Sequence, residues 1–339
     1  MTGDPGRMDP MLGYFLTFLV ISNGALYEDQ VADRLIRKAS DATYHLRLNE
    51  ARTAATELQQ RYPEHPAGFL IMAETYWWEA QTDPHNEKIE SAYYRAQEMA
   101  QERAEFAVKA GKYYKPEALA YLASAHGSYA RFEVTQKESF YRAMRAGLRA
   151  HRYAKEAYEL DPNYYDVYVG LGAFNYFSGT LPSVIKPFAW LFGASGDKDL
   201  GVRQLETAIQ KARYSVTEAR IVYYSALLAN KEYGAAFPML ERLMTDYPDN
   251  FVLYDWASEW FLEQDKREEG CQYFERLHSR QTDRPLLAQH ALLEKANLQL
   301  AQDRKAEALE TLKRIKGMGG SDPLVATKVQ ALEIEARKK

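Results

Sequence analysis

Seven histidines are spread along the chain, and none of them has the spacing of a metal site. A zinc protease needs two histidines one helical turn apart, as in His-Glu-x-x-His, so that both rings bind the same ion. The histidines here are His45, His65, His85, His126, His151, His278 and His290, and no such pair occurs among them. The sequence therefore predicts neither a metal site nor a metal cofactor.

Two glycine-rich stretches are candidates for a phosphate-binding loop. Residues 193–196 and 317–320 lack the Lys-Ser/Thr pair that completes a phosphate-binding loop. The Gly-x-Ser-x-Gly turn of a serine nucleophile is also missing. Because no set of nucleophile, base and acid assembles, the chain is predicted to be non-catalytic and without a cofactor. An enzyme of unrecognised type remains a third alternative.

Aromatic and amide side chains are the candidates for binding a partner. Tyr76, Trp77 and Trp78 are consecutive, and a helix turns about 100° per residue, so all three cannot point into one core. Asn175 can hold a peptide backbone through its amide. Packing between helices is the competing interpretation, since large apolar side chains are normally buried. The partner-binding candidates are Tyr76, Trp77, Trp78, Tyr168, Asn175, Tyr176 and Trp190.

Composition and charge narrow the class of protein. The 339 residues are 46% hydrophobic and 27% charged, which is typical of a folded globular chain. The net charge of -4 does not favour nucleic acid as a partner, because binding to phosphates needs a clustered basic surface. A single cysteine, Cys271, excludes both an intramolecular disulfide and a paired-cysteine zinc site.

The N-terminus carries an apolar run, MLGYFLTFLVI, at residues 11–21. Small residues follow it at 22–25, which predicts a signal peptide over residues 1–25 with cleavage near Gly24 or Ala25. The chain would then be exported, most simply to a bacterial periplasm. Two alternatives remain open: an uncleaved inner-membrane anchor made by residues 11–21, and a buried first helix. The run is short for a membrane span, which needs about 20 residues.

Beyond residue 30, apolar residues recur three and four positions apart, which predicts helices throughout. Ala51 precedes Pro63 by the same twelve residues that separate Ala236 from Pro248. A small residue lets two helices approach closely, and proline ends a helix. This pattern predicts helix pairs stacked as repeats, of which two start at Thr217 and Phe251, 34 residues apart. A third starts near Gln289, with Ala308 as its small residue.

The centre and the end of the array are less regular. A helix over Pro323–Arg337 is expected to cap the array. In the central unit, residues 181–196 are an insert between two helices, the second of which is capped by Asp197 and runs to about Ala212. The insert either plugs the inside of the superhelix or presents an exposed aromatic patch to a membrane or a partner; its aromatic residues are Phe188, Trp190 and Phe192.

These segments resemble known families. Arg34–Pro63 and Thr217–Lys316 resemble the tetratricopeptide superfamily, which implies the fold and says little about activity. The insert, with Leu181-Pro182, Gly196-Asp197 and Leu200-Gly201, is similar to the eukaryotic tetratricopeptide family that includes inclusion-body-clearance and outer-mitochondrial proteins. The layout of long helix pairs also resembles the periplasmic T-component of some TRAP transporters. None of these resemblances implies catalytic residues.

The sequence thus predicts an all-α, tetratricopeptide-like, right-handed superhelix of about six irregular helix pairs over residues 31–339. Its predicted function is a non-catalytic scaffold or adaptor that binds a peptide or protein in the bacterial cell envelope. Nucleic acid is not expected, and the N-terminal segment is expected to supply any association with the membrane or envelope. The alternative is a ligand-binding accessory subunit of a transport system, with an apolar pocket closed by the insert.

Overall fold

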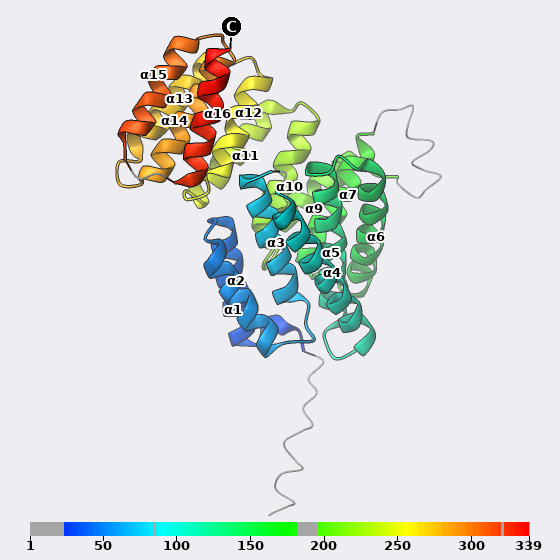
Figure 1. The fold of residues 1–339 in the computed structure, drawn as a ribbon. Helices are drawn as coiled ribbons and strands as arrows, with labels where there is room; N and C mark the ends of the chain where they lie inside the picture. Colours follow the sequence, from blue (N-terminus) through cyan, green and yellow to red (C-terminus); the bar gives the residue numbers. More distant parts are fainter. Residues whose placement is uncertain (1–23, 85, 182–194, 320–321, 339) are drawn as a thin grey trace, which may run out of the picture.

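A computed structural model describes residues 24–84, 86–181, 195–319 and 322–338 (Figure 1). Within these ranges every regular element is a helix, so the all-α prediction is confirmed. The first half contains η1 (Leu26–Glu28), α1 (Gln30–Tyr44), α2 (Leu48–Arg61), α3 (Ala67–Thr82), α4 (Glu87–Ala110), α5 (Lys115–Thr135), α6 (Phe140–Leu160), η2 (Tyr165–Val167) and α7 (Tyr168–Gly179). The second half contains α9 (Lys198–Lys211), α10 (Val216–Ala229), α11 (Tyr233–Asp246), α12 (Val252–Glu263), α13 (Arg267–Arg280), α14 (Pro285–Leu300), α15 (Lys305–Gly317) and α16 (Pro323–Arg337).

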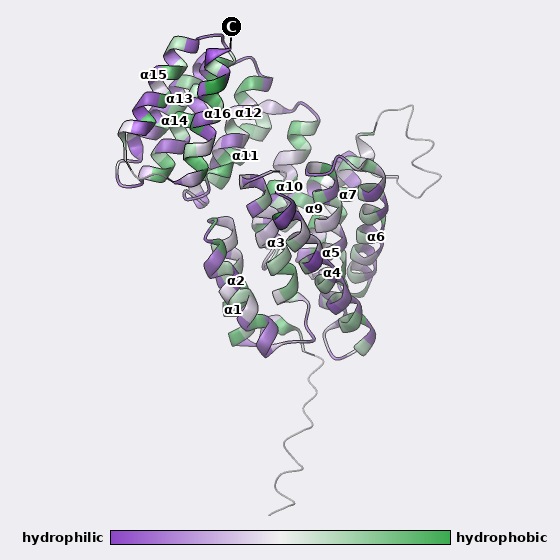
Figure 2. Cartoon of the chain, viewed as in Figure 1, coloured by the Kyte–Doolittle hydropathy of each residue, from purple (hydrophilic) through white to green (hydrophobic). Residues whose placement is uncertain are grey.

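The helices form consecutive pairs, and each pair packs against the next, as in a tetratricopeptide array (Figure 1). The first helices of the pairs are α1, α3, α5, α7, α10, α12 and α14, and their second helices are α2, α4, α6, α9, α11, α13 and α15. The described residues therefore hold seven pairs, where about six were expected, and α16 caps the last pair as predicted. Apolar and hydrophilic residues alternate along the helices, as an array with one buried side requires (Figure 2).

Small residues lie where paired helices cross. Ala51, Ala236 and Ala308 are fully buried, which confirms the small positions expected from the spacing. A very close approach joins α7 to α9: a Cβ added to Gly201 would lie 2.5 Å from the backbone N of Tyr176. Only glycine permits this contact, because a real Cβ cannot come so near to a backbone atom.

A repeated turn joins the two helices of most pairs. Five non-glycine residues have a left-handed backbone with φ between 51° and 59°, and each stands two residues before a second helix begins. They are Leu46, Glu138, Lys231, Asp265 and Asp303. Because this conformation is costly for residues with a Cβ, its recurrence indicates that the same turn is imposed by the packing of each helix pair.

Two local predictions can be compared directly with the helix ends. Asp197 caps α9 by accepting a hydrogen bond from the Leu200 backbone N–H at 3.0 Å, as predicted. By contrast, α14 begins at Pro285, four residues before the repeat start expected at Gln289. Proline suits the first turn of a helix, where its missing N–H has no partner to lose, so the helix extends back to that residue.

The array curves until its N-terminal helices touch the later units. Trp78 of α3 stacks on Trp256 of α12 with ring centroids 5.8 Å apart. The ring of Tyr44, at the end of α1, lies 5.3 Å from that of Tyr247, which follows α11. Side chains from α1, α3 and α12 and from the residue after α11 therefore meet inside the superhelix, and this interior is a candidate site.

Candidate functional site

An ion network occupies the interior between three first helices. Arg131 of α5 forms ion pairs with both Glu74 of α3 and Glu218 of α10. Its guanidinium also lies 4.0 Å from the ring centroid of Trp77, and the Ser128 hydroxyl donates to Glu74. Two carboxylates thus face one guanidinium, with these side chains only 16 to 27% exposed.

Burial governs the electrostatics of this network. Burial raises the pKa of Glu218 above its usual value, and the positive charge of Arg131 only partly opposes this effect. Burial alone would lower the pKa of Arg131, but the carboxylates of Glu218 and Glu74 raise it above its ordinary value. The guanidinium therefore stays charged and ties three helices together, which is a structural role.

The three consecutive aromatic residues of α3 pack in this interior. Trp77 and Trp78 are 3% and 1% exposed, and Trp78 lies between Tyr44 and Trp256. Tyr76 is partly exposed, with the Arg52 guanidinium 4.2 Å from its ring centroid. As expected from helical geometry, the three rings do not share one environment. The two tryptophans make contacts within the chain, and their binding of a partner remains a prediction.

The candidates on α7 point to separate neighbours. The Tyr168 hydroxyl donates to the Pro162 carbonyl at 2.9 Å. The Asn175 amide donates to Gln204 Oε1 at 2.8 Å, and the buried Tyr176 hydroxyl donates to Glu232 Oε1 at 2.9 Å.

Each of these α7 side chains therefore stabilises the fold, and they do not join the α3 aromatics in one site. Trp190 lies outside the described residues, and so does most of the insert. Binding of a partner by any of these residues remains a prediction.

A buried carboxylate that the sequence analysis missed holds the start of the chain. Glu117 of α5 is fully buried and accepts a hydrogen bond from the Leu26 backbone N–H at 2.6 Å. Burial raises the pKa of Glu117 to about 7. The signal was available in the sequence, because Glu117 is an isolated acid at the start of the apolar stretch ALAYLA.

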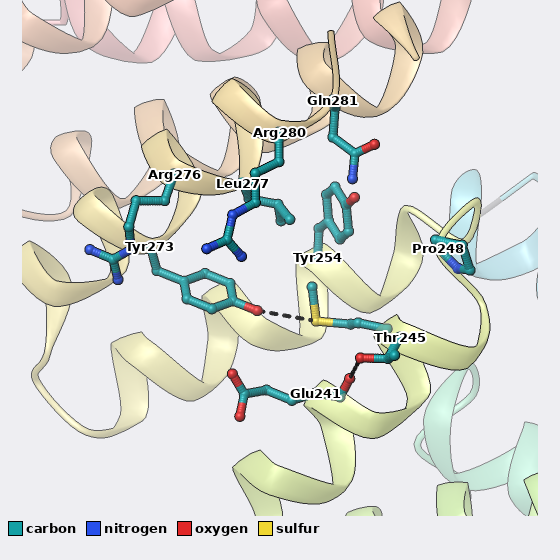
Figure 3. A pocket seen from close by; sticks show the side chains of 10 residues that line it. Glu241, Thr245, Pro248, Tyr254, Tyr273, Arg276, Leu277, Arg280 and Gln281 are labelled. Carbon is teal, nitrogen blue, oxygen red and sulfur yellow. Dashed lines mark hydrogen bonds between the residues drawn. The ribbon is translucent and has the colours of Figure 1, made fainter. Parts of the chain in front are cut away.

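A surface pocket between α11 and α13 has a different character (Figure 3). It encloses about 210 Å³, and Figure 3 shows side chains from both helices and from α12 around it. Arg276 and Arg280 of α13 are exposed and have no ion pair among the residues that the structure describes. The other residues that line the pocket include Glu241, Met244, Thr245, Tyr254, Tyr273, Leu277 and Gln281.

The pocket combines cationic groups with neutral hydroxyls and an apolar wall. Burial, as the main cause, raises the pKa of Tyr254 and of Tyr273 to about 12, so both remain protonated donors at neutral pH. The Tyr273 hydroxyl lies 3.7 Å from Met244 Sδ, a weak acceptor that a stronger one can replace. Two guanidinium groups and one carboxylate, that of Glu241, line the space. The arrangement suits a carboxylate flanked by an apolar group.

The parts of the chain that the structure describes contain no cluster of three or more metal-ligating side chains. No helix among the described residues is long and apolar enough to cross a membrane.

Comparison with protein families and with curated proteins finds no match for this chain. Among solved structures, it is similar to a tetratricopeptide repeat protein from Parabacteroides merdae at 13% identity. That match covers 90% of this chain and 99% of the other, with a TM-score of 0.36. A similarity this weak assigns no function. The narrower likeness of the insert to the eukaryotic tetratricopeptide family receives no support.

Proposed function

We propose that this protein is a non-catalytic helical-repeat adaptor that binds an acidic segment of a peptide or protein in the α11/α13 pocket. The observation that carries the proposal is the pair of exposed arginines, Arg276 and Arg280, beside an apolar wall. Arrays of helix pairs present extended surfaces for partners, which suits an adaptor.

The pocket supports this function better than the interior does. In the interior, Arg131 is already neutralised by two carboxylates, and Trp78 is enclosed by rings. In the pocket, the charges of Arg276 and Arg280 are matched by no carboxylate at ion-pair distance within the described ranges. Hydrogen bonds to charged groups are the stronger ones, about 1.5–3 kcal/mol each, so an incoming carboxylate would gain the most here.

Fluorescence anisotropy can test this proposal. The probes are fluorescein-labelled peptides that carry Asp or Glu beside a leucine, each compared with its Asn or Gln twin. The full chain is expected to bind the acidic peptides, and the double variant Arg276→Gln/Arg280→Gln to bind them at least tenfold more weakly, since tenfold corresponds to about 1.4 kcal/mol.

The matched control is Arg203→Gln on α9, an exposed arginine outside the pocket. Its affinity for the peptides should equal that of the unchanged protein, with circular dichroism verifying the fold of all variants. Equal binding of the acidic peptides and their neutral twins would refute the proposed recognition.

The cell envelope is the proposed location, on the strength of the apolar run at residues 11–21 and the small residues after it. That segment lies outside the described residues except for Gly24 and Ala25. Sequencing the N-terminus of the mature protein from fractionated cells tests it. A start at residue 25 or 26 in the periplasmic fraction supports export, whereas an intact N-terminus in the membrane fraction supports the anchor.

The alternative function is an accessory subunit of a transport system. Its apolar ligand pocket would be closed by residues 181–196, and only the sequence supports it. Native mass spectrometry of the gently purified protein distinguishes the two functions. A retained small molecule would favour the ligand-binding accessory subunit over the adaptor.

A further inference from the structure

We propose that the outward face of α6 docks on an anionic lipid surface. This inference is independent of the α11/α13 pocket. It rests on three features of one helix: exposed aromatic side chains, a run of arginines without acids, and the position of α6 at the outer edge of the array (Figure 1).

Large apolar side chains cover one flank of this face. Phe140 and Tyr141 are 73% and 65% exposed, the highest values among the exposed large hydrophobic residues, and Met144 is 40% exposed. Phe140 and Met144 are four residues apart and share a flank, which the partly exposed Leu148 continues. Burying such side chains is favourable, so their exposure indicates that something covers this face.

Arginines cover the other flank. Arg145, Arg149 and Arg152 are exposed and follow one another at spacings of four and three, so they lie on one side of the helix. None of the three has an ion pair with a carboxylate among the described residues, whereas Arg142 pairs with the buried Glu133 at 2.8 Å. The first acidic residue of α6 is Glu156.

This charge is unusual within the chain. The whole protein has a net charge of -4, yet residues 140–155 contain four arginines, one lysine and no acid. Arginine beside exposed aromatic residues is the composition of helices that lie in the headgroup region of anionic membranes. The aromatic flank would enter the acyl boundary while the guanidinium groups bind phosphates.

A second copy of the chain fits this surface poorly. A symmetric contact would bring two copies of this face together, each with four arginines, one lysine and no acid over residues 140–155, and their like charges would repel. The exposed side chains of this face all come from one helix, whereas a peptide partner needs a groove. An extended, negatively charged, partly apolar surface is the complement, and a lipid bilayer has these properties.

Vesicle co-sedimentation of the full chain tests the inference. The vesicles are phosphatidylcholine alone, or phosphatidylcholine with about 30% phosphatidylglycerol. The readout is the ratio of bound protein on anionic and neutral vesicles, because an apolar N-terminal run would bind both kinds. We expect a clear preference for anionic vesicles that declines with rising salt.

Two variants separate the contributions. Arg145→Gln/Arg149→Gln/Arg152→Gln should reduce the anionic preference at least tenfold, and Phe140→Ser/Tyr141→Ser should reduce binding to anionic vesicles. All substituted side chains are exposed, and circular dichroism verifies that both variants fold. Arg203→Gln on α9 is the matched control and should retain the preference.

Three outcomes would overturn the inference. One is that the unchanged protein has no preference for anionic vesicles, or that the arginine variant keeps this preference in full. Another is a dimer in analytical ultracentrifugation that Phe140→Ser abolishes, because the face would then be an interface between copies. Binding of α6 to an acidic protein instead of vesicles would also contradict the lipid as its occupant.

Discussion

The Asn250 side-chain amide donates a hydrogen bond at 2.8 Å to the backbone carbonyl of Tyr44, which lies 206 residues earlier. Asn250 also accepts a hydrogen bond from the Val252 backbone N–H at 3.1 Å, at the start of α12. One buried side chain therefore links the first helix pair to the sixth, and it holds the curved array closed at this point.

Replacing Asn250 with alanine should lower the free energy of unfolding by about 1–3 kcal/mol, because the Tyr44 carbonyl would lose its buried donor. Urea denaturation followed by circular dichroism measures the change. Asn49→Ala is the control, since Asn49 is exposed at the start of α2, and its effect should stay within about 0.5 kcal/mol. Equal effects of the two substitutions would contradict the linking role of Asn250.

The stability of the protein should depend on pH through Glu117. Its pKa is raised from 4.5 to about 7 in the fold by burial, so the folded state binds the proton more tightly than the unfolded chain. The contribution of this group is fully present below about pH 4.5 and is lost as the pH rises through about 7, by about 3 kcal/mol. Glu117→Gln should remove that part of the decline.

The measurement is the free energy of unfolding of the unchanged protein and the Glu117→Gln variant across this pH range. Comparing the two curves cancels the other titrating groups. If both curves keep the same slope between about pH 4.5 and about pH 7, Glu117 does not have the raised pKa.

Gly201→Ala should destabilise the contact between α7 and α9. The new Cβ would lie 2.5 Å from the Tyr176 backbone N and 2.8 Å from the Gly172 carbonyl oxygen, and backbone atoms cannot rotate away. The expected loss is about 1–3 kcal/mol. Gly234→Ala in α11 meets nothing within 4 Å and should instead gain about 0.5–1 kcal/mol. Thermal denaturation with both variants side by side decides the matter.

Lys231→Gly should stabilise the turn before α11. The lysine has φ of 59°, and relief of this strain, about 1–2 kcal/mol, exceeds the entropy cost of glycine, about 0.5–1 kcal/mol. The net gain of roughly 0.5 kcal/mol appears in urea denaturation. Lys313→Gly, in the middle of α15, should lose about 1 kcal/mol instead. A loss at position 231 would mean that the lysine is not strained there.

The helix pairs were predictable because their signals are local. Ala51 indicates where a second helix can pack closely, and Pro63 indicates where that helix ends. The same spacing recurs at Ala236 and Pro248. Asp197 and the helix over Pro323–Arg337 were predicted for the same reason, since a cap and an apolar period act within a few residues. The start of α14 was missed because the repeat spacing placed it near Gln289, whereas Pro285 begins the helix.

The surroundings of the candidate residues were less predictable. Tyr76, Trp77 and Trp78 could be placed on one helix, but the neighbours that enclose them come from α1, α5 and α12. The α11/α13 pocket was missed because Arg276, Arg280 and Tyr254 have no shared motif. Two of them lie one helical turn apart on α13, and Tyr254 comes from α12.

The sequence by itself determined that this chain is a succession of helix pairs, because helix periods, small crossing residues and terminating prolines are encoded within about 34 residues. Only the tertiary structure decided that Tyr44 meets Asn250 and that Trp78 stacks on Trp256. These contacts depend on small rotations between successive pairs that accumulate along the array. No single repeat specifies the summed rotation. The summed rotation decides which aromatic side chains are enclosed and which arginines remain open to a partner.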